Sequence, residues 1–260
     1  MSNPLLNDRS AAEAARAGWG APVSDGPVSP WQSTVRTQVM TVEGTATATG
    51  VLLVLLLAAA VVGWTTAPDG DGIPGVALIG MVVGLVCALA VAFRPRLARV
   101  LGPVYALAEG FFLGVVSRAY EQWEDGIVVQ AVGATLAVFA VMLVVYRLRI
   151  IRVTDRFRRI VIGATMGLMV FYLGAFVIRL IAGSDAVGFL NSASPLGIGF
   201  SVLAAGLAAM MLAVDFDLIE RGAAEKWPKG MEWFAAFGLL VTLVWLYLEM
   251  LRLLSKLNRR

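Results

Sequence analysis

The 260-residue chain is 59% hydrophobic and only 15% charged, whereas a soluble domain is roughly half apolar and about a quarter charged. This balance excludes an ordinary soluble globule and indicates a protein embedded in lipid. The formal net charge of +3 is no sign of nucleic-acid binding, because most basic residues stand in short connections between apolar segments.

Residues 1–44 are polar, contain four prolines and show no basic start followed directly by an apolar run. They do not have the form of a cleavable signal peptide. They also carry too little apolar surface to offset the entropy lost on folding. We predict a disordered cytoplasmic tail at 1–44, followed by a membrane domain at 45–260.

Seven apolar segments follow, and each approaches the roughly 20 residues that a helix needs to cross a bilayer. They lie at about 47–67, 73–93, 102–119, 127–146, 160–182, 196–214 and 233–254. The sequence therefore predicts an all-α polytopic membrane protein with about seven transmembrane helices. Three pairs of glycines four residues apart predict close helix crossings: Gly80/Gly84, Gly110/Gly114 and Gly163/Gly167.

The connections between these segments alternate in charge. Arginines and lysines gather after the second, fourth and sixth segments, while the other connections are acidic and nearly free of both. The positive-inside rule then places the N-terminus and the basic connections in the cytoplasm. The last segment leaves two alternatives open: a crossing puts the basic C-terminal end outside, against the rule, whereas re-entry keeps that end inside.

The residue types that the chain lacks limit the catalytic and metal-binding chemistry open to it. The chain has no histidine and a single cysteine, Cys87. The lack of histidine excludes Ser-His-Asp triads and His-ligated zinc, and one cysteine cannot form a disulfide framework or a thiolate cage. We expect no enzymatic activity, no cofactor and no tightly bound metal.

An ionisable side chain inside the membrane costs about 2.5–3.5 kcal/mol on insertion scales, so each one needs a reason to be there. Glu109 in the third segment has no oppositely charged residue three or four positions away, which favours a functional role. Glu249 and Arg252 are three apart and could neutralise each other within one helix. Asp217 and Arg221 are four apart at the end of the sixth segment and could form a solvated surface pair.

Two further positions complete the candidate set. Arg118 stands near the outer end of its segment, where a long side chain can reach the interface. Asp215 lies at the end of the sixth segment and Glu249 in the seventh. Carboxyls from different helices that come close together share a proton, because like charges repel at short range. Asp215 and Glu249 are the natural candidates for such a pH-sensing pair.

Three motifs in this order and spacing resemble the Bax inhibitor family, the YccA-like proteins with a transmembrane BAX inhibitor motif. They are Pro103-Val-Tyr-Ala-Leu-Ala-Glu-Gly, Asp215-Phe-Asp-Leu-Ile and Trp245-Leu-Tyr-Leu-Glu-Met-Leu-Arg. The long polar tail resembles the actinobacterial-type branch. The resemblance implies a seven-helix fold with the last helix central, in a bacterial plasma membrane.

The resemblance also implies a pH-sensitive calcium leak governed by two acids on the sixth and seventh helices. Asp215 matches the first of these acids, Glu249 falls at the second, and Glu109 matches an acidic pore position, with Asp217, Arg252 and Arg118 as supporting charges. Transient calcium binding is then expected at Glu109, Asp215 and Glu249.

The depths of Asp215 and Glu249 in the membrane decide whether the two acids can pair. If the last helix begins at Met231, Glu249 lies about 27 Å along it, far from Asp215. Pairing therefore requires that residues 222–237 lie largely at the interface, with Glu232 and Trp233 interfacial.

The leading interpretation is a passive, proton-gated path for calcium or another cation, whose immediate partner is the bilayer. A secondary transporter would need an internal repeat and broken helices at mid-membrane, which the sequence does not clearly show. A regulatory, partner-binding membrane protein is the other alternative. The basic cluster at 147–159 would attract anionic lipid at about 1 kcal/mol per residue, but the sequence identifies no protein partner.

Overall fold

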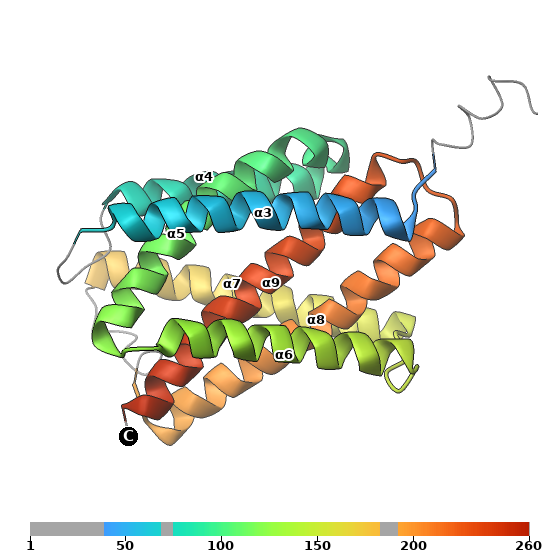
Figure 1. Cartoon of the computed structure of the whole chain (residues 1–260). Helices are drawn as coiled ribbons and strands as arrows, with labels where there is room; N and C mark the ends of the chain where they lie inside the picture. The colour runs from blue at the N-terminus through green and yellow to red at the C-terminus, as the bar shows by residue number, and fades with distance from the viewer. Residues whose placement is uncertain (1–38, 69–74, 183–191, 260) are drawn as a thin grey trace, which may run out of the picture. The chain divides into compact units, whose positions relative to one another are not determined.

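The computed structural model describes residues 39–68, 75–182 and 192–259 (Figure 1). These residues form seven α-helices, and a short 3-10 turn, Pro95–Leu97, precedes the third. The helices are α3 (Val42–Thr66), α4 (Gly75–Phe93), α5 (Ala98–Trp123), α6 (Ile127–Arg147), α7 (Asp155–Ala182), α8 (Pro195–Ala224) and α9 (Met231–Asn258). The all-α prediction is confirmed. Of the predicted tail, residues 1–38 lie outside the described residues, and 42–44 belong to α3.

Six of the described helices are long and apolar enough to cross a membrane. The exception is α4, whose described apolar part, Ala77–Phe93, is shorter. The predicted segments 102–119 and 196–214 were too short, because α5 has 26 residues and α8 has 30. Both helices continue past their apolar runs, and at the end of α8 an ion pair one turn apart, Asp217 with Arg221, supports the polar extension.

The last helix is continuous and central. The 28 residues of α9 span about 42 Å at 1.5 Å per residue, more than the roughly 30 Å of a hydrocarbon core. An unbroken helix does not turn back, so the re-entrant alternative does not apply. α9 packs on α3, α5, α6 and α8, and Figure 1 shows it (red) passing between α3 (blue) and α6 (green). This confirms the predicted central position.

Contacts at the helix ends identify the two ends of the bundle. At one end, the Met40 amide before α3 donates to the Trp227 carbonyl in the α8–α9 connection. At the other, the Arg259 guanidinium lies 5.1 Å from the Trp123 ring at the end of α5. The C-terminal basic residue therefore lies beside the acidic α5–α6 connection.

Two of the three glycine pairs lie where helices touch. A Cβ at Gly110 or Gly114 would overlap the carbonyl oxygen of Leu56 or Ala60 on α3, and a Cβ at Gly80 would lie 2.7 Å from the Ala108 carbonyl oxygen. Backbones can approach this closely only without a side chain between them. At the third pair, Gly163 and Gly167 on α7, an added Cβ would have no atom of another described helix within 4 Å, so that predicted crossing is wrong.

Candidate functional site

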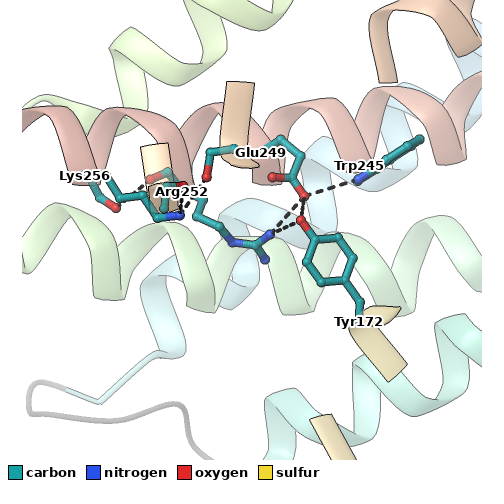
Figure 2. Close-up of polar contacts among 8 residues, drawn as sticks. Tyr172, Trp245, Glu249, Arg252 and Lys256 are labelled. Carbon is teal, nitrogen blue, oxygen red and sulfur yellow. Dashed lines mark hydrogen bonds and ion pairs between the residues drawn. The ribbon is translucent and has the colours of Figure 1, made fainter. Parts of the chain in front are cut away.

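One face of α9 carries a polar row inside the bundle. Trp245, Glu249, Arg252 and Lys256 follow one another at spacings of four, three and four, which places them on one side of a helix. Figure 2 shows this row beside Tyr172, which comes from α7. The row begins in the apolar part of α9 and ends near the C-terminus.

Glu249 carries the single carboxyl of the row and is deeply buried, with 1% of the residue exposed. Its Oε1 accepts hydrogen bonds from the Tyr172 hydroxyl at 2.8 Å, the Arg252 Nη1 at 2.9 Å and the Trp245 Nε1 at 3.3 Å. Its Oε2 is buried and has no hydrogen-bond partner among the described residues. The predicted neutralisation by Arg252 is therefore observed, but it uses only one carboxylate oxygen.

Arg252 and Tyr172 link α9 to α7. The Arg252 Nη1 donates to the Tyr172 hydroxyl at 2.7 Å, and the guanidinium lies 5.0 Å from the centre of the tyrosine ring. The hydroxyl thus accepts from Arg252 and donates to Glu249. This closed triangle joins α7 to α9 through the Glu249 carboxylate.

Lys256 links the end of α9 to the start of α8. The residue is 2% exposed, and its Nζ donates to the Gly197 carbonyl at 2.8 Å and to the Ser201 Oγ at 2.7 Å. A buried ammonium needs such acceptors because burial removes its hydration. Through Tyr172 and Lys256, the polar row joins three helices.

Asp215, on α8, lies against the first half of α9, away from the polar row. The residue is 5% exposed, lies beside Gly238 with Oδ1 3.7 Å from a Cβ placed there, and interacts with the side chain of Thr242. Its Oδ2 is buried without a hydrogen-bond partner among the described residues.

The structure does not bring Asp215 and Glu249 together as a hydrogen-bonded pair. Gly238 and Thr242, which face Asp215, precede Glu249 by about three and about two helical turns. The two acids are apart because α9 begins at Met231. For a helix that begins there, the sequence predicts that Glu249 lies too far along the helix to meet Asp215. Glu232 lies at that end of the bundle but is only 5% exposed, because its Oε1 accepts from the amide and hydroxyl of Thr41 at the start of α3.

Glu109 lies between α4 and α5 and is 9% exposed. Its Oε2 occupies the space that a side chain at Gly84 would fill. One turn earlier on α5, the Tyr105 ring packs against Phe237 at 5.0 Å between centroids. The Glu109 carboxyl therefore faces α4, whereas the Asp215 carboxyl faces α9.

The supporting charges have partners of their own. Asp217 forms an ion pair with Arg221 and lies 3.6 Å from the Arg158 Nη2 of α7, so the predicted surface pair is present and extends to a third residue. Arg118 stacks over the Trp64 ring of α3 at 5.6 Å. It therefore lies away from Glu109, as expected for residues on opposite faces of one helix.

Sequence reasoning missed Tyr172 and the role of Lys256. The spacing of the row on α9 could have indicated Lys256, whereas no local pattern marks Tyr172, which reaches the site only through helix packing. Among the described residues, no group of three His, Cys, Asp or Glu side chains could hold a metal ion. Glu109, Asp215 and Glu249 therefore do not converge on one metal site.

The helical bundle with buried charges on its central helix defines an integral membrane protein of the polytopic all-α class. The family described as Bax inhibitor 1 like matches residues 3–259, essentially the whole chain. The chain belongs to that family. A search of curated proteins gave no match.

Proposed function

We propose that this chain forms a passive leak path for cations across the bilayer, with calcium as the favoured ion, and that acid promotes the leak. The observation that carries this proposal is the Glu249 carboxyl, which is 1% exposed with one oxygen bonded to three donors and the other to none among the described residues. An ionisable group at such a position is a functional candidate, because the bilayer makes it costly.

Three buried carboxyls supply the chemistry that calcium needs. Calcium prefers oxygen ligands and tolerates irregular geometry. Glu109, Asp215 and Glu249 each present carboxylate oxygens inside the bundle, on α5, α8 and α9. Because these sites are separate, each would bind calcium weakly, which suits passage better than storage.

Proton control follows from the triangle of Glu249, Arg252 and Tyr172. A proton on Glu249 removes the negative charge that Arg252 neutralises and weakens the charge-assisted bond from Tyr172. The contact between α7 and α9 then loosens. In this proposal the ionised triangle is the closed state. Asp215 responds to protons as a second, independent group.

Calcium influx into liposomes tests the proposal. The full-length chain is reconstituted around a trapped calcium dye, and influx is recorded as the buffer passes from alkaline to mildly acidic. We expect influx to rise with acid. Glu249→Gln should give high influx at every pH, Asp215→Asn should lose part of the pH response, and Glu109→Gln should lower influx throughout.

Asp217→Asn is the matched control, because Asp217 lies on the same helix as Asp215 but is ion-paired near the end of the bundle. It should keep the wild-type pH response. Influx no greater than in empty liposomes would refute the leak. An unchanged pH response in both Glu249→Gln and Asp215→Asn would refute the assignment of the proton sensors.

A further inference from the structure

The connection between α6 and α7 carries a dense group of arginines. Six of the thirteen residues from 147 to 159 are arginines, against one acid, Asp155. Arg158 forms ion pairs with Asp155 at 3.3 Å and with Asp217 at 3.6 Å. The other five are exposed, and their side chains form no ion pair or hydrogen bond with another described residue: Arg147, Arg149, Arg152, Arg156 and Arg159.

Exposed aliphatic side chains alternate with the first of these arginines. In Arg147-Leu-Arg-Ile-Ile-Arg, Leu148 is 66% exposed and Ile150 is 69% exposed. Aliphatic groups beside exposed cations are typical of segments that lie in the membrane interface. A soluble acidic partner would supply the negative charge but no hydrocarbon. The headgroup region of an anionic bilayer supplies both within one layer.

The length of α6 places this segment at headgroup level. The 21 residues of α6 span about 32 Å at 1.5 Å per residue, close to the roughly 30 Å of a hydrocarbon core. Its last residue is Arg147. The Tyr146 hydroxyl donates to the Glu220 carboxylate near the end of α8, so the two helices end at a similar level. The residues that follow Arg147 therefore lie where acyl chains meet phosphates.

The protein holds this connection in a defined conformation. The amides of Arg149 and Ile150 donate to carbonyls in the last turn of α6 at 2.9 Å and 3.1 Å. Arg149 has a φ of 56°, the left-handed backbone that commonly closes a helix. At the start of α7, the Thr154 Oγ1 accepts from the Phe157 amide at 3.2 Å. A surface that is ordered before binding loses little conformational entropy on binding.

We propose that the α6–α7 connection is a binding surface for anionic phospholipid. Arg147, Arg149 and Arg152 contact the phosphates, and Leu148 and Ile150 contact the first part of the acyl chains. Lipids with a net negative charge are preferred, because a zwitterionic headgroup adds a cation that the arginines repel. The surface is independent of the proposed leak, since it uses none of the three buried carboxyls.

Native mass spectrometry of the full-length chain in detergent tests this preference. Equal amounts of dioleoylphosphatidylglycerol and dioleoylphosphatidylcholine are added, which share their acyl chains and differ in net charge. We expect more phosphatidylglycerol to stay bound. Arg149→Gln with Arg152→Gln should weaken phosphatidylglycerol binding about thirtyfold, or about fivefold for each cation, and remove the preference.

Lys226→Gln with Lys229→Gln is the matched control. It removes two exposed cations from the α8–α9 connection, and Lys226 has nearly the same backbone as Arg149, with a φ of 54°. Neither lysine adjoins a Leu, Ile or Val. This variant should keep the preference for phosphatidylglycerol. Equal retention of the two lipids by the wild type, or an equal loss in the two double variants, would overturn the proposed surface.

Two further measurements separate lipid binding from folding and from binding of free phosphate. Glycine adopts the left-handed backbone without strain, so Arg149→Gly should unfold at or above the wild-type temperature and yet bind phosphatidylglycerol about fivefold more weakly. Excess inorganic phosphate should not displace the lipid, because phosphate makes no contact with Leu148 and Ile150. Wild-type binding by Arg149→Gly would overturn the contact at Arg149. Displacement by inorganic phosphate would overturn the lipid surface in favour of a free-anion site.

Discussion

The crossing of α3 with α5 and the contact of α7 with α9 hold helices together by opposite means. At the first, glycines bring backbones into contact, and a Cβ at Gly63, Gly110 or Gly114 would overlap backbone atoms of the other helix. At the second, a Cβ added to any glycine of α7 would meet no other described helix within 4 Å, and Tyr172 bridges to Glu249 and Arg252 instead.

In the proposed function, this difference separates a fixed part of the bundle from a part that responds to protons. The backbone contacts that these glycines make with Phe111, Leu56 and Ala60 contain no titratable group. The α7–α9 contact includes one carboxylate, and in the proposed function a proton on it weakens the charge-assisted hydrogen bonds of the contact. We therefore expect substitutions at the polar contact to have effects that depend on pH, and substitutions at the glycine crossing to have effects that do not.

The largest effect is expected from Arg252→Ala. It leaves the Glu249 carboxyl buried without its cation, and removal of one partner of a buried ion pair typically costs about 3–5 kcal/mol. The measurement is thermal unfolding of the purified protein in detergent at neutral pH, where the variant should unfold at a clearly lower temperature. Acid should reduce the loss, because a protonated Glu249 no longer needs a cation.

The double variant Glu249→Gln with Arg252→Met is the control for that experiment. It removes both charges, so it should recover much of the stability lost in Arg252→Ala. If Arg252→Ala unfolded at the wild-type temperature, the ion pair would not support the α7–α9 contact.

A smaller but still large effect is expected from Gly114→Ala. The added methyl group overlaps the Ala60 carbonyl, and overpacking typically costs about 1–3 kcal/mol; a backbone group cannot rotate aside, so we expect about 2–3 kcal/mol here. Gly167→Ala adds the same methyl group on α7, where no other described helix lies within 4 Å. Thermal unfolding should separate the two variants at every pH, and equal stability would contradict the glycine crossing.

The sequence predicted the helical fold well and the site only in part. Apolar runs mark membrane helices because lipid offers no hydrogen-bond partners, so seven helices followed from hydrophobicity alone. The Glu249–Arg252 pair and the Gly110/Gly114 crossing also followed, since each depends on spacing within one helix. Asp215 facing Gly238, and Tyr172 facing Glu249, depend on how separate helices pack in depth and rotation, which local spacing does not encode.

The smallest and most specific effect is expected from Tyr172→Phe. It keeps the ring that packs against Phe200, 5.9 Å between centroids, but removes the hydroxyl between Glu249 and Arg252, at about 1.5 kcal/mol for hydrogen bonds to charged groups. Tyr247→Phe removes a hydroxyl that pairs with the neutral Ser117, so it should cost less, about 0.5–1 kcal/mol. At neutral pH, Tyr172→Phe should therefore unfold at a lower temperature than Tyr247→Phe. Acid should narrow this difference in unfolding temperature as Glu249 loses its charge. A gap that stayed constant with pH would mean that the α7–α9 contact does not depend on the charge of Glu249.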